Sequence, residues 1–97
     1  MYGLIGKMLT VEGKRDEVRD ILLKATGRMP GCHSYIVAKD ITDANAIWIT
    51  EVWDTKESHH ASLSLPAVKE AIGKARPLIA GFGESFTTNP VGGVGLV

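Results

Sequence analysis

The spacing of apolar and polar residues predicts a chain of alternating strands and helices. Between residues 13 and 29, apolar residues recur at intervals of three and four, which indicates one buried stripe on an amphipathic helix. Shorter runs with period-two alternation, or with apolar residues on both sides, indicate strands. The predicted elements are a strand over 2–11, a helix over 13–29, strands over 32–40 and 46–53, a short helix over 56–63, a helix from Pro66 to about Pro77 and a strand over 82–88.

Residues typical of helix ends support these boundaries. Pro30 disfavours helical backbone in the residue before it, so the first helix should stop there. Either Asp54 together with Glu57, or Thr55 alone, can cap the short helix through a side-chain oxygen. Ser64 can cap the helix that follows.

The order of elements predicts an α+β fold of the ferredoxin-like kind, βαββαβ with an antiparallel sheet, in one domain over residues 1–97. Helices can cover one face of such a sheet, yet β-type residues such as Ile47, Ile49, Trp48 and Val52 make both faces of the third strand apolar. Burying a few hundred Å² at roughly 25 cal/mol per Å² is comparable to the net stability of a small domain. We therefore expect a homodimer with sheet packed on sheet, and the apolar tail over 90–97 lying on the partner subunit.

Charge and cysteine content narrow the class of partner and compartment. Eleven Lys and Arg balance eleven Asp and Glu, so no strong field favours nucleic acid or a membrane surface. No run approaches the roughly 20 apolar residues that span a bilayer. With a single cysteine and no leader-like segment, a cytoplasmic location is expected.

Candidate acid–base residues cluster where the third strand ends. Glu51 and Trp53 lie two apart on a strand and so share a face, where apolar neighbours would partly desolvate the carboxylate. The alternative is a strand-end glutamate paired with a lysine or a backbone N–H. His59, one helical turn further on, can bring an imidazole that exchanges protons near neutral pH to the same place, or it can simply pack as a structural histidine. His60 points about 100° away from His59 on the helix, so both cannot face the same pocket, and one of the two is expected at the surface.

Other chemistry has weaker support. Glu57 and His60 are three apart on a helix, but no third ligand has a suitable spacing, so no metal site is predicted. Glycines at 92, 93 and 95 are followed by no helix, which argues against a dinucleotide cradle. Cys32 has no nearby cation or second cysteine and is expected to act as a small buried hydrophobe. No cofactor is predicted.

Three segments carry a resemblance to a known family. They are Glu51-Val52-Trp53-Asp54-Thr55 with a helix following at once, the turn Gly31-Cys32 leading to Tyr35, and Pro66-Ala67-Val68 opening a helix. Together they resemble the antibiotic biosynthesis monooxygenase family of dimeric α/β barrels. The resemblance implies a homodimer, with assembly beyond the dimer left open, and in each subunit a pocket for a small apolar aromatic ligand.

The resemblance also implies an activity and roles for residues. Enzymes of the family oxidise quinols, anthrones or similar phenolic compounds with O₂, often without metal or flavin. Here His59 or Glu51 would be the base, and Tyr35, Trp48 and Trp53 would wall the pocket. Many relatives have a histidine where this chain has Ser62, so the alternative is a non-catalytic dimeric module for small-molecule binding or stress response. The residues of the haem-degrading branch are absent, so haem degradation is not the expected function.

Overall fold

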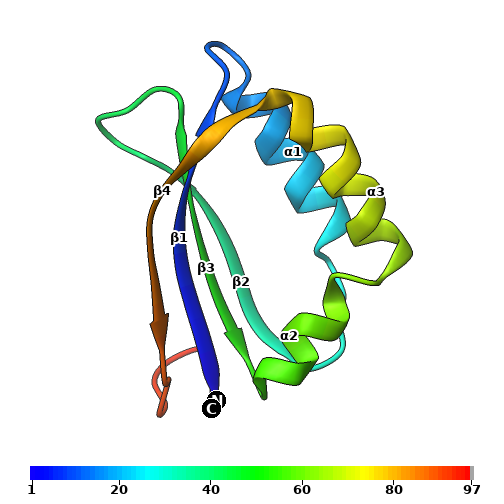
Figure 1. Ribbon diagram of the computed structural model, residues 1–97. Coiled ribbons are helices and arrows are strands. Elements are labelled where there is room, and N and C mark those ends of the chain that lie inside the picture. The colour runs from blue at the N-terminus through cyan, green and yellow to red at the C-terminus, as the bar shows by residue number, and fades with distance from the viewer. Residues whose placement is uncertain (97) are drawn as a thin grey trace.

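The computed structural model, which describes residues 1–96, has a four-stranded antiparallel sheet with all helices on one side (Figure 1). Its strands lie in the order β2-β3-β1-β4. The elements are β1 (Tyr2–Thr10), α1 (Arg15–Ala25), β2 (Cys32–Lys39), β3 (Ala46–Trp53), α2 (Lys56–Ser62), α3 (Pro66–Ala75), a 3₁₀ turn (Arg76–Leu78) and β4 (Ile79–Thr88). The predicted α+β, ferredoxin-like fold is confirmed. Because α2 and α3 are separate helices between β3 and β4, the full order is βαββααβ.

Several predicted boundaries were wrong, each for a local reason. The first helix ends at Ala25, well before Pro30. Directly after this end, the Thr26 hydroxyl donates to the Leu22 carbonyl (2.7 Å). Ser64 does not cap α3, because Leu65 occupies the N-cap position and the Ser64 amide belongs to the turn after α2, where it donates to the Ala61 carbonyl (3.0 Å). The last strand begins at 79 instead of 82, since the 3₁₀ turn leads directly into it.

The α2 cap came from the simpler of the two predicted alternatives. Thr55 has extended backbone angles, and its hydroxyl accepts a hydrogen bond from the amide of Ser58 (3.1 Å). An N-cap side chain satisfies an amide that has no acceptor inside the helix. With this cap, α2 starts three residues after Trp53, which places the helix at the end of β3.

The core lies between the helices and one face of β3. Ile47, Ile49 and Trp53 point toward the helices and are buried, with Val18 of α1 and Val68 of α3 opposite them. The predicted period-two alternation in β3 is therefore confirmed. Most β1 residues are only partly buried, because no helix covers the second face of this strand.

The opposite side of the sheet carries apolar residues that no helix covers, and we call it the open face. Strand register places on it residues from all four strands. Its apolar members are Ile5, Leu9, Ile36, Trp48, Val52 and Phe86. Ile36 and Phe86 are each 55% exposed, so the open face presents apolar surface to water.

The C-terminal tail extends beyond the sheet. Val91 and Val94 are exposed, and the Leu96 amide donates to the Gly93 carbonyl (3.1 Å) in a turn. The predicted tail includes Val97, which lies outside the described residues. None of the helices over 1–96 is long and apolar enough to cross a bilayer.

Candidate active site

Two neighbouring elements, β3 and α2, bring Glu51, Trp53 and His59 together. The Trp53 indole Nε1–H donates to Glu51 Oε1 (3.0 Å), and His59 Nε2 lies 3.8 Å from the same oxygen. The imidazole meets the Trp53 ring edge-on at 5.4 Å between centroids and is tilted against Tyr2 at 5.7 Å. One carboxylate oxygen is therefore shared by an indole N–H and an imidazole held between two aromatic rings.

Gly31 fixes how the start of β2 approaches this site. Its φ of +81° lies in the left-handed region, which residues other than glycine rarely adopt. A Cβ at this position would lie 2.6 Å from Asp54 Oδ1 and 2.7 Å from Ser58 Oγ. The Gly31 carbonyl also accepts the Asp54 amide (2.9 Å). The glycine thus lets the β2 entry turn pack directly against the β3–α2 junction that holds His59.

Glu51 and His59 border a cavity of about 210 Å³ between the sheet and the helices. Tyr35 of β2 and Trp53 also line it, and most of the remaining wall is aliphatic. The other lining residues are Met8, Leu22, Ala25, Thr26, Met29, Ile49, Ser62, Leu63, Val68, Ala71 and Ile72. An apolar chamber with a few convergent polar groups has the form expected of a small-molecule site.

Burial sets the ionisation of Tyr35. Removal from water, then the negative charge of Glu51 and the neighbouring Cys32, raise the pKa of the Tyr35 hydroxyl well above its usual value. Tyr35 and Glu51 are paired across β2 and β3, so both point to the helix-facing side. A tyrosine that stays protonated can donate a hydrogen bond to a ligand at the same end of the cavity as Glu51.

Glu51 and His59 are both largely shielded from solvent. Their side chains are 16% and 23% exposed, and no buried side-chain nitrogen or oxygen within residues 1–96 lacks a hydrogen-bond partner. The carboxylate oxygen of Glu51 lies 3.8 Å from the imidazole nitrogen of His59. The arrangement offers a bound molecule an imidazole and a carboxylate side by side, the side-chain types used in general acid–base catalysis.

The structure does not bring every predicted site residue to the cavity. Trp48 lies on the open face, where its indole donates to Asp40 Oδ2 (2.7 Å) and Lys7 sits 5.8 Å from its ring centre. Of the two neighbouring histidines, His60 is the exposed one and does not line the cavity. Cys32 is half-buried near the β2 entry, and burial raises the pKa of its thiol. Trp48 is therefore on the wrong side of the sheet to wall this cavity.

Sequence reasoning missed several wall residues from distant segments. Met8 of β1 closes the cavity although it lies far from the strand-three motif, and Ile72 of α3 lines it as a member of the apolar stripe of that helix. Leu22 and Met29 also line the cavity. The sequence indicated only that they belong to the apolar stripe of the helix predicted over 13–29. Ser62 lines the cavity and is buried, with its hydroxyl donating to the His59 carbonyl (2.6 Å).

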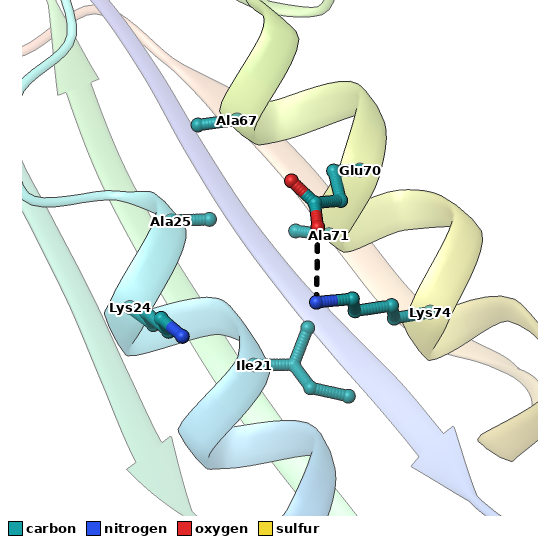
Figure 2. Close-up of a pocket in the computed structure, with 7 residues that line it drawn as sticks. All are labelled: Ile21, Lys24, Ala25, Ala67, Glu70, Ala71 and Lys74. Carbon is teal, nitrogen blue, oxygen red and sulfur yellow. Dashed lines mark ion pairs between the residues drawn. The ribbon is translucent and has the colours of Figure 1, made fainter.

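A separate groove of about 190 Å³ runs between α1 and α3 (Figure 2). Figure 2 shows Ala25, Ala67 and Ala71 facing one another across it, with the Lys74–Glu70 ion pair (3.0 Å) on α3. Two of its three charged lining residues, Glu70 and Lys74, pair with each other, and it is lined by no aromatic side chain. Within residues 1–96, no three His, Cys, Asp or Glu side chains are arranged so that they could hold a metal ion.

Comparison with known proteins agrees with the fold. The model of the family described as antibiotic biosynthesis monooxygenase matches residues 1–74. A crystal structure from Chloroflexus aurantiacus J-10-fl, of a protein that carries this family's name, is 57% identical, with a TM-score of 0.95 over 99% of this chain and 98% of that one. A ferredoxin-like α+β protein with a sheet-to-helix cavity is the class defined by the structure.

More distant structures show the fold alone. One from Deinococcus radiodurans is 24% identical with a TM-score of 0.78, over 97% of this chain and 96% of that one. One from Nitrosomonas europaea is 13% identical with a TM-score of 0.83, over 94% and 99%. No curated protein matches the sequence. The chain belongs to the antibiotic biosynthesis monooxygenase family.

Proposed function

We propose that the chain is a cofactor-independent monooxygenase that oxidises a small quinol, anthrone or phenolic compound with O₂. The observation that carries this proposal is the Glu51–His59 pair, 3.8 Å apart, at one end of a mostly aliphatic cavity. A phenol or anthrone becomes a strong reductant once it loses a proton. The protein then has to supply a base, a dry cavity and a hydrogen-bond donor. In this proposal His59 is the base, the aliphatic wall keeps the cavity dry, and Tyr35 is the donor.

The chemistry divides into a proton transfer and an oxidation. His59 takes a proton from the substrate, and Glu51 stabilises the imidazolium that forms. The Tyr35 hydroxyl donates to the oxygen on which negative charge develops. The electron-rich ring carbon then forms a bond with O₂. For an anthrone, the CH₂ group becomes a carbonyl: one oxygen atom enters the product, and the other leaves with the two hydrogens as water.

Oxygen consumption with and without the base tests this proposal. A panel of naphthalene diols and anthrones is incubated with protein in an oxygen electrode, with ¹⁸O₂ labelling of the product. We expect His59→Ala to lower the rate by 10²-fold or more, in line with loss of a general base. The matched control is His60→Ala, the same substitution one residue along α2 at an exposed position, which should keep the rate. No oxygen uptake above buffer, with ligand retained unchanged, would favour the binding-module alternative.

The open face is the basis for the second part of the proposal, a homodimer formed by packing sheet on sheet. It exposes Ile36 and Phe86, and the helices lie on the other side. A twofold pairing would cover both copies at once. Sedimentation should show a dimer that Phe86→Glu dissociates. Ile41→Glu is the control, because Ile41 is 98% exposed but lies in the loop after β2, off the sheet. A folded wild-type monomer at micromolar concentration would disprove this assembly.

A further inference from the structure

A second apolar cavity adjoins the candidate active site. Its volume is about 510 Å³, within the range of small-molecule sites. Met8, Leu22 and Ile72 line both cavities, so the two meet along these three side chains. The remaining lining residues of the second cavity are Ala75, Arg76, Ile79, Ala80, Gly81 and Phe82. A ligand at Glu51 and His59 can therefore extend past Met8 into further apolar space.

Arg76 is the one charged residue that lines the second cavity. It follows the last residue of α3 and begins the 3₁₀ turn, and its side chain is exposed. Within residues 1–96 it forms no ion pair and no side-chain hydrogen bond, whereas Arg15 donates to loop carbonyls and Arg19 pairs with two aspartates. An unpaired guanidinium at the edge of an apolar cavity is a ready partner for an anion.

The two ends of the joined cavities thus differ in charge. Val68 lines the first cavity and Arg76 the second, and their separation of eight positions along α3 and into the 3₁₀ turn corresponds to about 12 Å of helical rise. This is close to the length of a fused tricyclic aromatic skeleton. An anionic group is repelled by Glu51 and attracted by Arg76, so attraction and repulsion favour the same orientation.

We propose that Arg76 binds an anionic substituent, such as a carboxylate, at the far end of a fused aromatic ligand whose other end lies at Glu51 and His59. This inference rests on the proposed function and specifies its substrate class: an acidic, polycyclic phenol rather than a neutral one. Arg76 acts as a specificity residue. It holds the ligand so that the reacting ring reaches His59, and it takes no part in the proton transfer.

A pair of unreactive fluorescent probes tests the inference by binding alone. Anthracene-2-carboxylate and anthracene-2-carboxamide have the same skeleton and differ in charge. The full chain should bind the carboxylate about tenfold more tightly, the effect of one charge-assisted hydrogen-bonded contact. In Arg76→Gln this preference should disappear while affinity for the amide stays. Rising salt should reduce the preference in wild type only.

Lys74→Gln is the matched control, because it removes the same charge two residues away. Lys74 pairs with Glu70 beside the groove of Figure 2 and does not line the second cavity. This variant should keep the full preference. Equal binding of both probes by wild type, or equal loss of both in Arg76→Gln, would overturn the proposal. His59→Ala separates it from the proposed function: a retained carboxylate preference supports the Arg76 site even if no probe or substrate is ever oxidised.

Discussion

Replacing Glu51 by glutamine tests the role of the carboxylate with little change in shape. The glutamine carbonyl oxygen can still accept the Trp53 indole N–H, which now bonds Glu51 Oε1 at 3.0 Å. What disappears is the negative charge 3.8 Å from His59 Nε2. The substitution therefore separates charge stabilisation of the imidazolium from the packing of the cavity wall.

The magnitude follows from the distance and the burial. Two unit charges 3.8 Å apart interact by about 1 kcal/mol in water and about 4 kcal/mol at an effective dielectric constant of 20. Both side chains are mostly shielded but border an open cavity, which places the loss between these limits, at about 2 kcal/mol. If His59 gains its proton in the rate-limiting step, the rate falls by about 30-fold.

Initial rates of oxygen uptake under saturating substrate measure this loss. Glu57→Gln is the control, since Glu57 is exposed on the same helix as His59 and undergoes the same chemical change. Circular dichroism and urea unfolding establish that Glu51→Gln is folded. A folded Glu51→Gln protein that turns over at the wild-type rate would refute the assignment of Glu51 as the partner of the base.

Three further predictions concern the cavity, the β2 entry turn and the open face. Tyr35→Phe should lower turnover about tenfold but leave unfolding free energy nearly unchanged, because it removes one donor to developing charge; equal rates would exclude that donor. Gly31→Ala should lower the free energy of urea unfolding by about 1–3 kcal/mol through strain at positive φ and contact with the β3–α2 junction, whereas Gly27→Ala, with open space around it, should not. The Trp48 indole, then the amides that follow in the loop, hold the pKa of Asp40 well below its usual range. A lowered folded-state pKa stabilises the fold above about pH 4 and loses that effect as pH falls, so wild type should lose stability more steeply below pH 4 than Asp40→Asn in acid titrations of unfolding.

Trp48 shows where the family resemblance and the residue pattern diverged. The resemblance suggested that Trp48 walls the pocket, but its period-two position opposite Ile47 and Ile49 already placed it on the other face. The structure follows the pattern: Trp48 packs with Lys7 and bonds Asp40 on the open face. Strand alternation is a local geometric constraint, so it outweighs an inferred role.

The sequence by itself determined the elements and which neighbours share a face. Glu51 and Trp53 were predicted on one face of β3, with His59 one helical turn away, and these depend only on strand and helix periodicity. Only the tertiary structure decided that Met8, Leu22 and Ile72 close a cavity over them and that Arg76 lies at its far end. Those residues come from separate elements, and their meeting depends on how helices pack on a curved sheet, which local spacing does not encode.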